Sequence, residues 1–149
     1  MAQTYFGSTL RAGSGTLTDT VDGGYVVMTQ NVTVTTVAAG TAVTGSITLP
    51  ASSQIINFII DQTVDEAVGG GTATVINATI GTAAAGTQYL SAKDVVSGGR
   101  PALTFTAAQL LAMQNIGANT GVYFTIAPNG TISTTQGTYV LTVLYAQKV

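Results

Sequence analysis

Hydrophobic and polar residues alternate along much of this chain, which is the pattern of β-strands with one buried face. In the segment 43–49, Val43, Ile47 and Leu49 share one parity. In the segment 25–37, apolar residues hold one parity and threonines hold the other: Val26, Met28, Val32 and Val34 against Thr29, Thr33 and Thr35. Branched β-carbons of Thr, Val and Ile favour the strand over the helix. The pattern predicts a β-rich protein from Tyr25 onward.

The run Ile55-Ile56-Asn57-Phe58-Ile59-Ile60 is apolar on both parities. A strand of this kind is typical of a sheet centre, so we expect it to be covered on both faces. Glycines and prolines fall at or near the joins between the apolar segments, as turns require. Further strands are predicted over 72–80, 87–91, 102–106, 121–127, 131–135 and 138–146.

One stretch predicts a helix. Thr106-Ala-Ala-Gln109 matches a capping box, and Asn115 and Gly117 would end the helix after one or two turns. Its short apolar face consists of Leu110, Leu111 and Met113. The fold class predicted is therefore all-β: a jelly-roll-like β-sandwich of about eight strands with one short helix and an extended N-terminal arm. An immunoglobulin-like sandwich shares these patterns, so the strand order stays open.

Residues 1–24 are rich in Gly, Ser, Thr and Asp and show no sustained period. They predict an extended arm, followed by a β-sandwich domain over 25–149. Tyr5 and Phe6 have no core of their own within such an arm, so we expect them to bury against another surface. The predicted partner-binding residues are Tyr5, Phe6, Leu10 and Arg11.

The composition narrows the functional classes. A chain of 149 residues and 15.0 kDa is one domain's worth of protein. Charged residues are 7% of it, against about 25% in a typical soluble domain. With a net charge of −2 and no basic cluster, binding to a nucleic-acid backbone is not expected. A surface of hydroxyls and amides suits many copies packed side by side, because like charges would oppose assembly.

Candidate chemistry is sparse. Absence of Cys and His removes thiolate nucleophiles, the commonest general base and the commonest transition-metal ligands. Asp61, Asp65 and Glu66 form the one acidic cluster, which is a weak candidate for a calcium site and is better explained as a solvated strand end. We therefore expect no enzyme activity, no catalytic residue, no cofactor and no resident metal. Two explanations of the aromatic residues stay open: a sugar-stacking platform, or core and rim positions. We favour the second.

The N-terminus lacks the basic and apolar regions of a secretory signal, and no apolar run approaches a membrane span. We therefore expect synthesis in the cytoplasm and no membrane partner.

Several segments resemble the small jelly-roll virion proteins of tailed bacteriophages. The likeness covers about residues 43–146. It includes Leu49-Pro50-Ala51 before a hydrophobic strand, a glycine-threonine hairpin that ends in Ile80-Gly81, a segment opening on Tyr89, and the C-terminal strand Tyr139–Tyr145.

This resemblance implies a capsid decoration protein, also called a cement or head-stabilising protein. Such proteins sit on the capsid exterior of the virion, commonly as homotrimers at three-fold and quasi-three-fold positions. They bridge subunits of the major capsid protein. The resemblance brings no catalytic residues with it.

A second class stays open: a carbohydrate-binding or receptor-binding jelly-roll module of a phage fibre or surface structure. It would need an exposed aromatic platform or a calcium site. A hydrolase is a distant third, because the chain has so few acids to supply a carboxylate pair.

Overall fold

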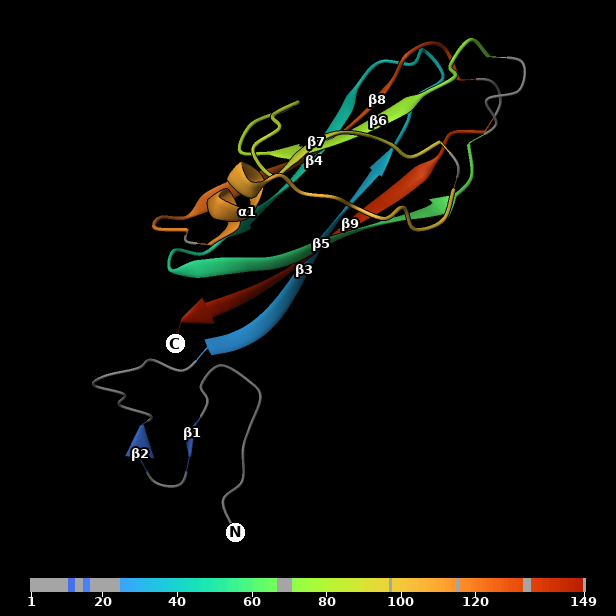
Figure 1. Ribbon diagram of the computed structural model, residues 1–149. Coiled ribbons are helices and arrows are strands. Elements are labelled where there is room, and N and C mark those ends of the chain that lie inside the picture. The colour runs from blue at the N-terminus through green and yellow to red at the C-terminus, as the bar shows by residue number, and fades with distance from the viewer. Residues whose placement is uncertain are drawn as a thin grey trace.

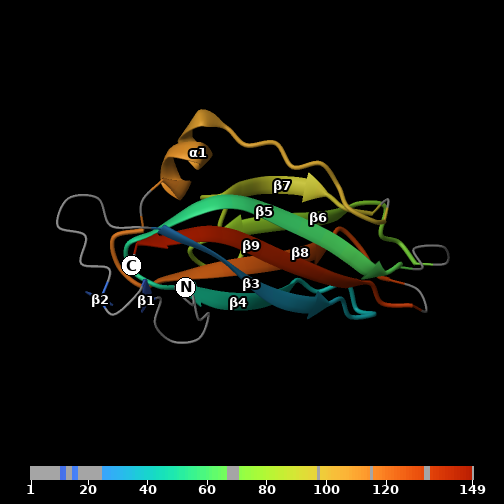
Figure 2. The ribbon, with the colours of Figure 1, turned by 90° about the horizontal axis from the view of Figure 1, so that it is seen from below.

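Two antiparallel sheets pack face to face in the computed structural model, which describes residues 11–12, 15–16, 25–66, 71–96, 98–114, 116–132 and 135–148. One sheet has three strands in the order β3 (Tyr25–Thr35), β9 (Thr138–Lys148) and β5 (Ser53–Val64). The other has four strands in the order β4 (Val43–Leu49), β8 (Thr120–Pro128), β6 (Ile76–Gly81) and β7 (Leu90–Asp94). Figures 1 and 2 show the two layers. The predicted all-β sandwich is confirmed.

The strand order is that of a jelly roll that lacks one of its eight strands. Strands β3, β9 and β5 form one sheet and β4, β8, β6 and β7 the other, so the missing strand would lie beside β5, between β7 and β8 in the chain. The segment 98–105 lies near that place. It makes one backbone hydrogen bond to β5, from Gln62 N to Gly99 O at 2.8 Å, and packs Phe105 against Phe58 with ring centroids 6.3 Å apart.

The predicted strand over 102–106 is therefore wrong. Its apolar residues Leu103 and Phe105 do pack against the core, but Pro101 has no N–H to donate and the segment forms no ladder. The predicted strand over 131–135 is not formed by its described residues 131, 132 and 135. Strand β6 begins at Ile76 and not at residue 72, since Asn129 Oδ1 accepts from the backbone N–H groups of Thr74 and Val75 at 2.8 and 3.1 Å.

Strand β5 also corrects an expectation, because it lies at an edge of its sheet and not at the centre. A register shift between Ile55 and Asn57 marks a β-bulge at this point. The bulge changes which parity faces inward, so that Ile55, Phe58 and Ile60 are all buried while Ile56 is 48% exposed. An apolar run on both parities is thus explained by one extra residue and not by two covered faces.

The helix α1 (Ala107–Met113) forms as predicted, with both capping-box hydrogen bonds between Thr106 and Gln109 present. Buried Gln109 also donates to Thr87 O and Ser91 Oγ, which ties the helix to the start of β7. Of the predicted apolar face, Met113 is buried, but Leu110 and Leu111 are exposed. Helix α1 lies on the side of the sandwich where β5 and β7 are the edge strands (Figure 2).

The other side of the sandwich is closed by a close approach of β3 to β4. A Cβ atom built on Gly45 would lie 2.6 Å from Val32 Cγ2 and 3.0 Å from Val34 Cγ2. Glycine is therefore required where the edge strands of the two sheets meet.

We predict that Gly45→Ala lowers the free energy of unfolding by about 1 to 2 kcal/mol, because the added methyl overlaps two stiff valine side chains. Thermal unfolding followed by circular dichroism measures the change. Gly117→Ala is the matched control, since no atom lies within 4 Å of its added carbon, and an equal loss in both variants would contradict the argument.

Candidate interaction surface

The first residues of β3 expose large apolar side chains. Tyr25 is 60% exposed, Val27 59% and Met28 42%. Met28 has the parity of buried Val34, so it lies on the inner face of its sheet, yet much of its side chain is exposed. Figure 1 shows why: the ends of β3 and β9 extend beyond the four-stranded sheet.

Gln30 marks the point at which the core closes. Its Nε2 donates to the Tyr145 hydroxyl at 3.0 Å and to Thr48 O at 3.3 Å, so it bridges the two sheets. Tyr145 itself is buried. We call this bridging glutamine the polar seal. The apolar start of β3 lies beyond it, outside the core.

The outer face of the three-stranded sheet carries further apolar residues. The register between the strands places Val27, Leu144, Ile59 and Val140 on this face, with threonines and asparagines between them. Ile56, at the bulge, is exposed on the same strand as Ile59. We call these five residues the outer sheet face.

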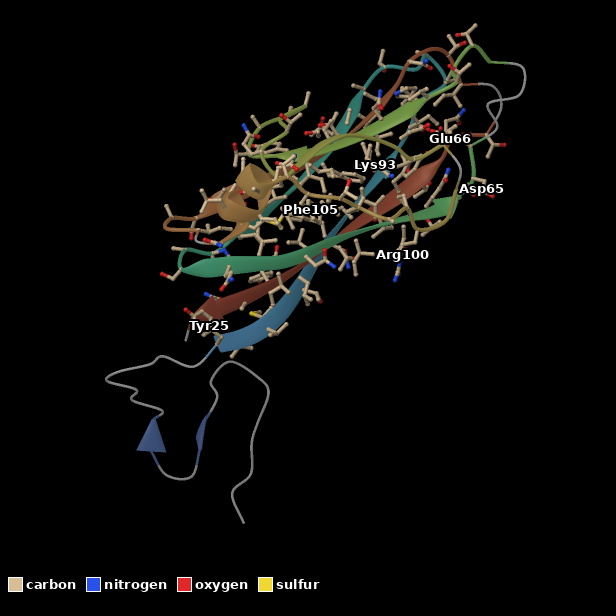
Figure 3. All side chains as sticks on the ribbon, in the orientation of Figure 1. Tyr25, Asp65, Glu66, Lys93, Arg100 and Phe105 are labelled. Atoms are coloured by element: carbon tan, nitrogen blue, oxygen red, sulfur yellow. The ribbon has the colours of Figure 1, made fainter. Side chains whose placement is uncertain are left out.

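The acidic residues lie away from the exposed end of β3, where the charged residue in the described register is Lys148, the partner of Tyr25 on β9. Asp65 and Glu66 lie at the opposite end of the sandwich from Tyr25 (Figure 3). Arg100 binds Asp61 through two hydrogen bonds, Nε to Oδ1 at 2.6 Å and Nη2 to Oδ2 at 3.0 Å. The Asp61 hydrogen bond and charge raise the pKa of Arg100.

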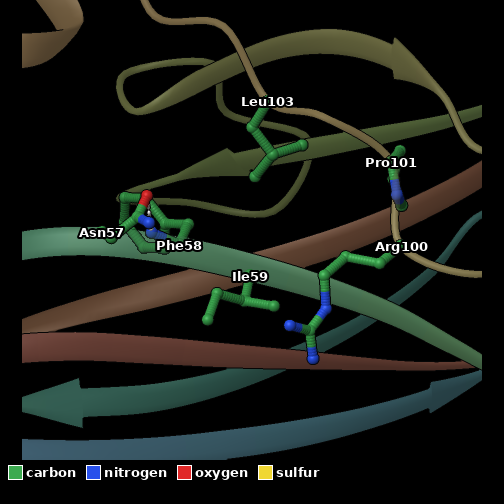
Figure 4. Close-up of a pocket in the computed structure, with 6 residues that line it drawn as sticks. All are labelled: Asn57, Phe58, Ile59, Arg100, Pro101 and Leu103. Carbon is green, nitrogen blue, oxygen red and sulfur yellow. Dashed lines mark hydrogen bonds between the residues drawn. The ribbon is translucent and has the colours of Figure 1, made fainter.

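Arg100 also borders a pocket of 280 Å³ between β5 and the segment 98–105 (Figure 4). Its lining is formed by Asn57, Phe58, Ile59, Arg100, Pro101 and Leu103. The pocket has one charged group, and that group is already neutralised by Asp61. It contains no second charged group for chemistry on a bound molecule.

The structure does not bring the weak calcium candidate together. Asp61 lies on β5 and forms an ion pair with Arg100, whereas Asp65 and Glu66 follow the end of that strand. Among the described residues, no group of three or more acidic, histidine or cysteine side chains could hold a metal ion.

Most of the described aromatic residues belong to the core, and the described part of the chain gathers no exposed aromatic platform. Tyr89, Phe124, Tyr139 and Tyr145 are buried, as the apolar residues around the last two suggest. Within the described part of the chain, Tyr25 is the aromatic residue that is exposed.

The predicted partner-binding residues Tyr5, Phe6 and Leu10 lie outside the described residues. Arg11 belongs to the short strand β1 (Arg11–Ala12), which pairs with β2 (Gly15–Thr16), and its side chain is not described. The exposed apolar start of β3 is a surface that the sequence reasoning missed. The signal was present in Tyr25-Val26-Val27-Met28, four apolar residues in a row that half-buried alternation does not explain.

Solved structures share this fold. One chain of the structure described as the capsid asymmetric unit of cyanophage Pam1 is 21% identical, with a TM-score of 0.55, over 92% of this chain and 96% of that one. A chain of the capsid of Ralstonia phage GP4 is 18% identical, with a TM-score of 0.52, over 88% and 89%. Both matches span nearly all of both chains, so the matched chains are close to this one in length. No protein-family model and no curated protein matches the sequence.

No helix in the described residues is long and apolar enough to cross a membrane.

Tyr139 gives the sandwich a pH dependence. Burial raises the pKa of its hydroxyl above the ordinary value of 10.0, and the nearby Glu66 carboxylate raises it further. The hydroxyl also accepts a hydrogen bond from Gln62 Nε2 at 3.1 Å. Above pH 10 the unfolded chain loses this proton while the folded protein keeps it, so folding stability falls as pH rises.

We predict that the free energy of unfolding declines above pH 10, with Tyr139 contributing a slope of up to about 1.4 kcal/mol per pH unit. In Tyr139→Phe this contribution is absent, so the decline is shallower. Urea unfolding at several alkaline pH values measures it, with Tyr25→Phe as the control at an exposed tyrosine. An unchanged slope in Tyr139→Phe would contradict the assignment.

Proposed function

We propose that this protein is a structural, non-enzymatic component of a bacteriophage virion that binds the outside of the capsid. The observation that carries the proposal is the match, along nearly the whole of both chains, to chains of comparable length in two phage capsid structures.

The surface properties support a role in binding and not in catalysis. The chain has four basic and six acidic residues and no histidine or cysteine. The one pocket described above holds a neutralised arginine, whereas the outer sheet face and the start of β3 offer apolar area. Apolar patches rimmed by polar residues mark protein interaction sites.

We further propose that the protein acts as a decoration, or cement, protein that bridges subunits of the major capsid protein. Residues 1–24, with Tyr5 and Phe6, are assigned to reach onto a neighbouring copy or onto the shell. The sparse charge supports this assignment, because densely arrayed copies then repel one another little.

Deleting residues 1–24 is predicted to leave the sandwich folded and to lower its occupancy on isolated capsids. In the full-length chain, Tyr5→Ser combined with Phe6→Ser should lower occupancy in the same direction. Quantitative gel densitometry of capsids after sedimentation measures occupancy, and circular dichroism checks the fold. Leu111→Ser is the control, since it removes one exposed apolar side chain from α1. Full occupancy of both arm variants would refute the arm's role, while no capsid binding by the unaltered chain would refute the proposed function itself.

The homotrimer expected of a decoration protein is tested in solution. We predict that light scattering behind size exclusion gives three times the chain mass of 15.0 kDa. A monomer that also fails to trimerise on capsids would contradict this part of the proposal.

A further inference from the structure

Strand β3 leaves one of its two edges unpaired in the described part of the chain. Its 11 residues pair with β9 without a register shift, and no described strand lies on the other side. Thr36 N donates to Gly137 O at 3.0 Å, which identifies the even-numbered residues as those bonded to β9. Val27, Thr29 and Asn31 therefore direct their backbone N–H and C=O groups to the free edge.

The free edge has a defined end. Further along β3, the Thr33 carbonyl oxygen lies 3.7 Å from where a Gly45 Cβ would be, and Val32 and Val34 pack on the same glycine. Strand β4 thus covers the backbone edge from about residue 32 onward, while on the inner face the Gln30 side chain already reaches Thr48 of β4. The open part is the segment 25–31, which we call the free edge of β3.

This free edge lacks three of the features with which proteins keep exposed edges from pairing: charge, proline and a bulge. Its sequence, Tyr-Val-Val-Met-Thr-Gln-Asn, contains no charge and no proline, and its register shows no bulge. Tyr25, Val27 and Met28 are all exposed along it. An edge so exposed, apolar and regular is a template for another strand.

The segment is complementary to a second copy of itself. We propose that two copies of the chain pair through the free edges of β3, antiparallel, about a two-fold axis at Val27. In that register Val27 faces Val27 on the outer face and Val26 faces Met28 on the inner face, while Tyr25 faces Thr29. The odd-numbered residues 25, 27 and 29 then supply about six backbone hydrogen bonds between the copies.

Charge and side-chain type favour this occupant. Because the segment is uncharged, antiparallel self-pairing brings no like charges together. The pairing also gives cross-strand neighbours to the three exposed apolar side chains of the segment, which lie outside the polar seal at Gln30. Two sandwiches thereby share one continuous sheet of six strands.

The contact is short, so in dilute solution it is weak and concentration-dependent. Copies held side by side on a surface have a much higher effective concentration, which favours the paired state. The inference requires only a second copy of the chain and does not rest on capsid binding or on the trimer.

The test uses the self-pairing of residue 27. Val27→Lys places two like charges opposite each other at the axis, whereas the matched control Thr33→Lys adds the same charge on the same outer face beyond the free edge. Sedimentation velocity from micromolar to millimolar concentration measures association of the full-length chain. We expect the mass of the unaltered chain and of Thr33→Lys to at least double as concentration rises, and Val27→Lys to associate about tenfold more weakly or not at all.

A mixture separates lost pairing from lost folding. Val27→Lys and Val27→Glu should each fail to pair alone, yet form a mixed pair when combined, because opposite charges then meet at the axis. Absence of doubling in the unaltered chain, or equal doubling in Val27→Lys, would overturn the proposal. So would hydrogen-exchange protection of the Val27 amide in the smallest unit, which would show the edge to be covered already.

Discussion

The inner face of β9 is the contact on which the rest of the structure depends. Tyr139, Leu141, Val143 and Tyr145 alternate along it, and all four are buried. The same strand pairs with β3 on one side and β5 on the other, so it positions both edges of its sheet. Loss of this apolar stripe would remove the packing between the sheets and the hydrogen bonding within one of them together.

Each open side of the sandwich is closed by a different means. On one side α1 and the segment 98–105 cover the edges of β5 and β7, partly through the buried amide of Gln109. On the other side β3 and β4 meet at Gly45, where their side chains leave no space for a methyl group. Neither device reaches the first residues of β3, which leaves their apolar side chains exposed.

The sequence predicts those elements whose pattern is local. Period-two alternation locates β3 and β4, the apolar segments 121–127 and 138–146 correspond to β8 and β9, and the capping box locates α1. The run 55–60 was misinterpreted because a bulge reverses the facing parity within a strand, which alternation alone does not reveal. The segment 102–106 has a strand pattern but lacks a hydrogen-bonded neighbour strand. Whether a strand finds such a neighbour depends on the tertiary fold and not on its own sequence. The exposed start of β3 was missed for the same reason, since an apolar residue is core or surface according to how far the opposite sheet extends.

The central place of β9 has a consequence for how the protein is made. Strand β9 is the last strand of the sandwich along the chain, yet its partners β3 and β5 come from the first half. Their pairing closes loops that span most of the domain, and such non-local contacts slow folding. During synthesis on the ribosome, β3 and β5 must wait for the final strand with their apolar faces uncovered. The newly made chain is therefore most vulnerable to aggregation just before its last strand emerges.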